Sequence, residues 1–149
     1  MSESILKLIP TNPNYVPSDQ IIKKVRNLFP SIFPHAQRFD FRTAENVEFI
    51  DPGANFESVS CPFCGSPVDI SWWQEAMDQA AGNKFSDLKI NTPCCGKSSS
   101  LNNLIYNWPA GFAKFTLSVI DPGHDPADEE IHALEDALQC RVKKIIAHY

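Results

Sequence analysis

The sequence predicts an α+β fold, with a mainly antiparallel sheet, flanking helices and a cysteine-rich insertion. Segments with strand and helix patterning are mixed irregularly along the 149 residues, which is typical of α+β rather than of regularly alternating α/β proteins. No linker, repeat or low-complexity tract divides the chain, and its length suits one compact unit. We therefore expect a single domain over residues 1–149, with residues 61–98 inserted into it.

The first predicted elements are a strand and a helix. Strand-forming residues fill the run from Ile5 to Ile9, which Pro10 ends. Ser18 is placed to cap a helix whose apolar residues recur at helical spacing as far as Phe29. Pro30 and Pro34 are predicted to end that helix, which then packs one face on the sheet.

The next segments predict a hairpin, a turn and a second helix. Charged and apolar residues alternate in Arg38–Arg42 and again in Val47–Ile50, and the polar link between them indicates a hairpin. Asp51-Pro52-Gly53 predicts a turn that leads to the first cysteine pair. Ser71 opens a capping-box pattern, so a helix is predicted from there to Gly82.

The C-terminal half predicts two further strands and a helix after a short strand. A strand is expected over Phe85–Ile90, and Ser100 is placed to cap a brief helix. The alternation of apolar and polar residues in Lys114–Val119 indicates a half-buried strand. Asp125 is expected to cap the last helix, and Val142–Ala147 to form the closing strand.

Two cysteine pairs carry the strongest chemical signal. Cys61 and Cys64 lie in Cys-Pro-Phe-Cys-Gly, a spacing that points two thiolates at one metal while the glycine permits the turn. Cys94 and Cys95 lie in Pro-Cys-Cys-Gly, about 30 residues further on, and supply two more sulfurs. Four thiolates are a ligand set of structural zinc sites, so the sequence predicts a zinc cofactor that pins the 61–98 insertion as a zinc knuckle.

The second pair needs a turn, because neighbouring residues point apart in a strand and Cys94 and Cys95 are adjacent. Pro93 and Gly96 favour such a turn. Two alternatives stay open. The cysteines are small buried apolar residues, or Cys-Pro-Phe-Cys is a redox dithiol like that of glutaredoxins, against which Pro67 argues because it disfavours the helix such a dithiol needs.

The cysteine region resembles a group of small bacterial proteins of unassigned function, some of which are labelled as transporter ATPases. The resemblance rests on Cys-Pro-x-Cys-Gly, on Pro-Cys-Cys-Gly and on Trp-Pro-x-Gly-Phe at residues 108–112, and it covers residues 61–122. The first knuckle is also similar to those of zinc-ribbon domains. The resemblance implies a cysteine metal site and carries no particular activity.

The sequence shows no convincing set of catalytic residues. Neither a His-Glu-x-x-His nor a Gly-x-Ser-x-Gly motif occurs. Gly96-Lys97-Ser98 matches the end of a phosphate-binding loop, but Asn91 stands where that loop needs a glycine, so ATP binding is rejected. An enzyme is the less favoured class, and a zinc- or thiol-dependent enzyme built around Cys64 or Cys95 is kept as an alternative.

Charge and aromatic content favour a protein partner. Eighteen acidic residues against thirteen Lys and Arg give a net charge of −5, which weighs against nucleic acid, although a zinc-ribbon nucleic-acid binder is kept as an alternative. Negative charge speeds association with a cationic protein such as a toxin. Aromatic residues flank the cysteine pairs and are the candidate partner-binding residues: Trp72, Trp73, Trp108 and Phe112.

These observations predict a cytoplasmic zinc-binding protein that acts as a protein-interaction module, and a toxin-neutralising immunity protein is the class that suits them. The opening residues, Met1 to Ser4, lack the basic flank and apolar core of a secretion signal. No run approaches the roughly 20 apolar residues of a membrane span. We therefore expect a cytoplasmic location and no membrane partner, while no pattern specifies the partner or the oligomeric state.

Overall fold

The structure is a computed structural model that describes residues 4–149. These residues form a four-stranded antiparallel sheet, three α-helices and two small two-stranded sheets, which confirms the α+β class with a mainly antiparallel sheet. Met1 to Glu3, on which the expectation about a secretion signal partly rests, lie outside the described residues. Within residues 4–149, none of the helices has the length and apolar character that crossing a membrane requires.

The four-stranded sheet is built from two interleaved β-α-β units. Its strand order is β2-β7-β1-β8, and every neighbouring pair is antiparallel. This order, with one helix after β1 and another after β7, is the split β-α-β arrangement of ferredoxin-like folds. The elements are β1 (Ser4–Pro10), α1 (Asp19–Ile32), β2 (Arg38–Ile50), β7 (Gly111–Ile120), α3 (Asp128–Leu138) and β8 (Val142–His148).

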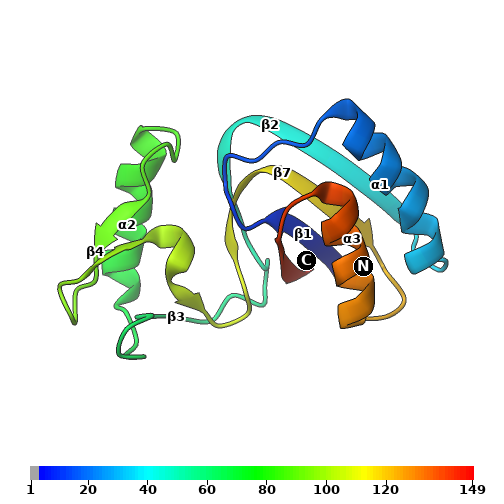
Figure 1. The fold of residues 1–149 in the computed structure, drawn as a ribbon. Coiled ribbons are helices and arrows are strands. Elements are labelled where there is room, and N and C mark those ends of the chain that lie inside the picture. The colour runs from blue at the N-terminus through cyan, green and yellow to red at the C-terminus, as the bar shows by residue number, and fades with distance from the viewer. Residues whose placement is uncertain (1–3) are drawn as a thin grey trace.

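Helices α1 and α3 lie together on one face of this sheet and enclose the first hydrophobic core (Figure 1). Phe115, Leu117 and Val119 of β7 are buried there, as their period-two alternation predicts. Leu134 and Leu138 of α3 are buried against them. The sheet face of each amphipathic helix is therefore the one that the sequence pattern indicates.

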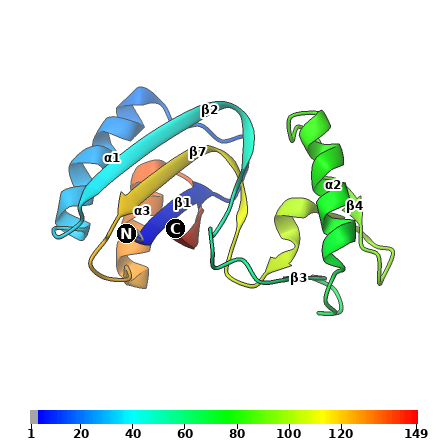
Figure 2. The ribbon, with the colours of Figure 1, turned by 180° about the vertical axis from the view of Figure 1, so that it is seen from behind.

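Residues 38–50 form one long strand, so the predicted hairpin is wrong. β2 pairs with β7 both before Thr43 and after Glu48, and the register is irregular between these two residues. The polar residues that suggested a turn form this irregularity, and the strand curls there instead of reversing (Figure 2). β2 is held extended by pairing with β7, which lies about 60 residues further along the chain. The local sequence pattern of residues 38–50 does not reveal this pairing.

Helix α1 starts as predicted and ends between the two prolines. The Ser18 side chain accepts a hydrogen bond from the Ile21 N–H at 3.3 Å, which confirms the cap. Of the two prolines predicted to end the helix, Pro30 lies inside it, and the helix ends at Ile32, before Pro34. A proline removes one backbone donor, and here the break comes only two residues later, where Phe33 N–H closes the last turn on the Phe29 carbonyl.

The starts of the other two helices differ from the predicted caps. The Asp69 carboxylate, not Ser71, caps α2, and it accepts from the Ser71 N–H at 2.8 Å. Asp125 does not cap α3 but pairs with a lysine of β8. The Glu130 carboxylate reaches back to the Ala127 N–H at 3.0 Å. Each helix start thus uses a nearby carboxylate other than the predicted residue.

The chain between β2 and β7 forms a lobe beside the sheet, which we call the cysteine lobe (residues 56–110; Figures 1 and 2). Trp73 and Tyr106 anchor a second hydrophobic core there, to which the start of β7 adds Phe112. Three short strands of the lobe, β3, β5 and β6, were not predicted. The one strand that was predicted there, over Phe85–Ile90, is the shorter β4. Its elements are β3 (Val59–Ser60), α2 (Ile70–Gly82), β4 (Lys89–Asn91), β5 (Ser98–Ser100), η1 (Leu101–Asn103) and β6 (Ile105–Tyr106).

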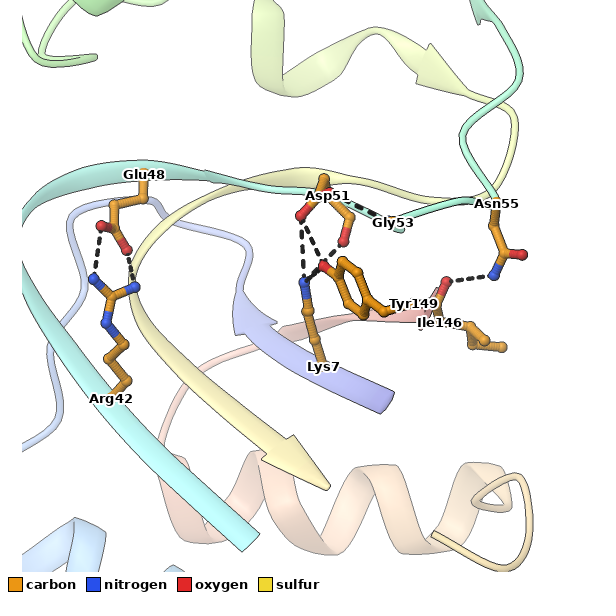
Figure 3. A network of polar contacts seen from close by, with 8 residues as sticks. All are labelled: Lys7, Arg42, Glu48, Asp51, Gly53, Asn55, Ile146 and Tyr149. Atoms are coloured by element: carbon orange, nitrogen blue, oxygen red, sulfur yellow. Dashed lines mark hydrogen bonds and ion pairs between the residues drawn. The ribbon is translucent and has the colours of Figure 1, made fainter. Parts of the chain in front are cut away.

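The chain enters the lobe along the free edge of β8. The Asn55 amide donates to the Ile146 carbonyl at 3.1 Å (Figure 3). The Ala54 N–H donates to the His148 carbonyl at 2.8 Å. Gly53 has a φ of 61°, and a Cβ atom there would lie 2.5 Å from the His148 oxygen. Glycine is therefore required where the chain leaves the sheet.

Asn102 in η1 links the lobe to the start of β7 and to the chain after β1. Its side-chain oxygen accepts from the Phe112 N–H at 3.1 Å, and its amide donates to the Thr11 carbonyl at 3.3 Å. The ammonium of Lys143 donates to the Ala110 carbonyl at 3.0 Å, and burial lowers the pKa of this lysine. These bonds tie the exit of the lobe to both β1 and β8.

Candidate metal centre

The first knuckle is a tight hairpin turn between β3 and Val68. The Cys61 N–H donates to the Ser66 carbonyl at 2.9 Å, and the Gly65 N–H donates to the Cys61 carbonyl at 2.9 Å. Gly65 has a φ of 74°, which a glycine adopts without strain. The Phe63 N–H lies 3.4 Å from the Cys61 sulfur and stabilises negative charge on it.

The second knuckle closes the hairpin of β4 and β5. The Thr92 N–H donates to the Lys97 carbonyl at 2.9 Å, and the Gly96 N–H donates to the Thr92 carbonyl at 2.7 Å. Gly96 has a φ of 65°. The expectation that the chain turns at Cys94 and Cys95 is therefore confirmed, and the turn lets two adjacent side chains face the same point.

The two turns bring the four predicted ligands together. The sulfur atoms of Cys61, Cys64, Cys94 and Cys95 all lie within 4.8 Å of one another, and those of Cys64 and Cys94 are 3.4 Å apart. Four sulfurs around a tetrahedral zinc ion at about 2.3 Å would be roughly 3.8 Å from each other. The cluster has the number, type and spacing of donors that one thiophilic metal ion needs.

The thiols of the cluster share protons through hydrogen bonds. The Ser66 hydroxyl and backbone N–H lower the pKa of Cys64 to about 6. The hydrogen bond to Cys64, together with burial, raises the pKa of Cys95 to about 12. Thiolates are the metal-binding form, so a metal ion at this cluster would take the place of the thiol protons.

The predicted aromatic surface is only partly at the surface. Phe112 is fully buried and Trp73 nearly so, both within the second core. Trp72 is half-buried, and Trp108 is exposed. Aromatic spacing beside a cysteine pair does not separate core from surface, because the lobe has an interior of its own that takes Trp73 and Phe112.

Sequence reasoning missed other apolar residues that are exposed on the cysteine lobe. Phe63 at the tip of the first knuckle is 48% exposed, and Ile105 in β6 is 51% exposed. Ile105 pairs with Ser60 in β3, and Ser60 also bridges to Pro67, so the outer face of this small sheet borders the first knuckle. No local signal identifies Ile105, because its exposure depends on which face of a two-residue strand packs inward.

Comparison with known proteins adds no relative. No protein-family model, no curated protein and no solved structure matches this chain. Within residues 4–149, the four cysteines are the group of His, Cys, Asp and Glu side chains placed to hold a metal ion.

Proposed function

We propose that the cluster binds one zinc ion with a structural role. The observation that supports this is the convergence of four sulfurs from two glycine-ended turns within 4.8 Å. Four thiolates fill a tetrahedral coordination shell, whereas catalytic zinc keeps one position for water or substrate. Zinc would bond the two knuckles to each other. This proposal favours a binding protein over a zinc enzyme.

Metal content tests the zinc proposal. Protein purified without added metal is expected to contain about one zinc ion per chain by elemental analysis. Cys64→Ser should lose the metal, because three thiolates remain. Cys140→Ser is the matched control and should keep it, because Cys140 lies in the sheet portion of the molecule. Equal metal content in both variants, or none in the wild type, contradicts the proposal.

We further propose that the cysteine lobe binds another protein. The exposed apolar side chains support this, since Phe63, Ile105 and Trp108 all belong to the lobe and are 48%, 51% and 38% exposed. The apolar ring of Phe63 also lies beneath the Lys97 ammonium, at 5.3 Å from the ring centre. Exposed aromatic and aliphatic anchors are typical of the centre of a protein interface. The zinc site would hold these anchors rigid.

The partner class we propose is a protein toxin met in the cytoplasm. The net charge of −5 supports attraction to a cationic partner. Unpaired cysteines suit a reducing compartment. Of the five acidic residues on α3, three are exposed and free to meet a partner: Asp128, Glu129 and Asp136. Glu130 and Glu135 bond backbone N–H groups.

Two matched substitutions test the interaction surface. Ile105→Glu places a charge on the outer face of the β3–β6 sheet, and Val16→Glu makes the same change at a residue that is 43% exposed in the sheet portion. A partner that co-purifies with the wild type from the native cell is expected to be lost with Ile105→Glu and kept with Val16→Glu. If both variants retain the partner with equal affinity, the cysteine lobe is not the docking surface.

A further inference from the structure

The two knuckles have the same backbone, residue for residue. Val59 to Val68 matches Ile90 to Ser99: the bridge between Ser60 and Pro67 has its counterpart in the pair formed by Asn91 and Ser98. The two backbone hydrogen bonds that close each turn also correspond, and each turn ends in a glycine with positive φ. The lobe therefore contains one turn used twice.

The cysteines do not follow this correspondence. Cys95 occupies the place of Cys64, but the counterpart of Cys61 is Thr92. Both of these first positions are buried, with relative exposures of 0% and 1%. The fourth sulfur comes from Cys94, whose counterpart in the first knuckle is Phe63, an exposed residue that binds no metal. The ligand set is thus asymmetric on a symmetric backbone.

Hydrogen bonds reinforce this asymmetry. The Cys61 sulfur accepts the Phe63 N–H at 3.4 Å. In the second knuckle the Thr92 hydroxyl, at the place of that sulfur, accepts the Lys97 N–H at 3.2 Å. An N–H donor stabilises a thiolate. In the second knuckle the N–H that reaches this buried place comes from Lys97, the counterpart of Ser66, and it meets a hydroxyl. Cys94 is exposed, as are Cys64 and Cys95, and among the four cysteines it alone stands at the position that Phe63 takes in the first knuckle.

We propose that Thr92 stands at the position that holds a metal ligand in the first knuckle, and that Cys94 takes over the ligand role. Cys94 is then the ligand that is released first and modified first. This inference rests on the proposed metal site. Three sulfurs occupy the positions that the knuckle backbone provides, and the fourth reaches the metal from a position outside that pattern. The lobe accordingly has one thiol that an electrophile can capture while the other three keep their places.

A ligand-transfer experiment tests the position of Thr92. In the full-length chain, Cys94→Ser is expected to lose its Zn²⁺ to a competing chelator. Adding Thr92→Cys to that variant should restore retention, because the new thiol stands where Cys61 stands in the first knuckle. Asn91→Cys with Cys94→Ser is the matched control, and it should not restore retention.

The reciprocal exchange in the first knuckle guards against a variant that does not fold. Cys61→Thr alone is expected to lose Zn²⁺, and Cys61→Thr with Phe63→Cys should keep it, since this pair copies the second knuckle. If neither double variant retains Zn²⁺ while the wild type does, the inference is overturned and the metal site stands. If the wild type itself holds no Zn²⁺, the proposed function fails instead.

Alkylation tests the order of release. In the Zn²⁺-loaded chain, the released thiolate attacks the CH₂ carbon of iodoacetamide; an S–C bond forms, the C–I bond breaks, and iodide leaves with the electron pair. Peptide mapping at short times should find Cys94 modified before Cys61, Cys64 and Cys95. Modification of any other cluster cysteine first overturns the proposed order.

Discussion

At the scale of single residues, Asn102 joins two distant parts of the chain. Its side chain bonds the Phe112 N–H of β7 and the Thr11 carbonyl after β1 at the same time. Asn102→Ala leaves the Phe112 N–H without its acceptor, which is expected to lower the free energy of unfolding by about 1–3 kcal/mol. Urea unfolding measures the change. Asn103→Ala, an exposed neighbour in the same turn, should have almost no effect, and equal losses contradict this role.

A second prediction concerns Cys140, the cysteine outside the cluster. Burial, and then the nearby Glu135 carboxylate, raise the pKa of its thiol to about 11. The folded state thus holds this proton more tightly than the unfolded chain, where a thiol titrates near 8.5, and it loses stability as the pH rises between these values. Alkylation of Cys140 in the folded protein should keep accelerating above pH 9. The same peptide in urea should level off near pH 9, and identical profiles refute the shift.

The site was more predictable than the surface around it. Cysteine spacing with flanking proline and glycine is a local signal, so Cys61, Cys64, Cys94 and Cys95 were identified and the structure places them together. The exposure of Trp73 depends on packing between α2 and β6, which brings its indole N–H within 3.3 Å of the Tyr106 hydroxyl. Packing of that kind joins residues far apart in sequence and leaves no periodic trace.

At the scale of elements, the crossing from β2 to the cysteine lobe depends on Gly53. An alanine there meets the His148 carbonyl at 2.5 Å and must also adopt a positive φ. Gly53→Ala is expected to destabilise the protein by about 1–3 kcal/mol, measured by thermal or urea unfolding. Gly82→Ala is the control: its Cβ meets nothing within 4 Å at the end of α2, and the change should be neutral or stabilising by up to about 1 kcal/mol. Equal effects contradict the argument.

Elements with strong one-sided periodicity were predicted well, and elements held by distant partners were not. The strand β7 and the apolar face of α3 were both predicted from the spacing of their own apolar residues. β2 reads locally as two strands and a link, yet it is one strand because β7 pairs along both halves. The two-residue strands β3 and β6 exist only as each other's partner. A short segment carries no pattern long enough to predict such pairing.

At the scale of the whole molecule, the chain has two hydrophobic cores with different supports. The first lies between the sheet and its two helices, and long strand ladders surround it. The second fills the cysteine lobe, whose strands are two or three residues long. A core with only one α-helix and such short strands around it gains stability from cross-links, and the proposed metal ion is one that joins the two knuckles.

This difference predicts that metal removal weakens one part of the molecule. All three tryptophans, Trp72, Trp73 and Trp108, lie in the cysteine lobe, so tryptophan fluorescence reports that lobe alone, whereas circular dichroism also reports the sheet and its helices. With Zn²⁺ bound, both signals should change at the same urea concentration, because the hydrogen bonds at Asn55 and at Asn102 couple the lobe to the sheet. With a chelator and a reductant present, the fluorescence transition should move to lower urea than the dichroism transition. Coincident transitions without metal would show that the second core holds the lobe together unaided, and that the four cysteines contribute little to its stability.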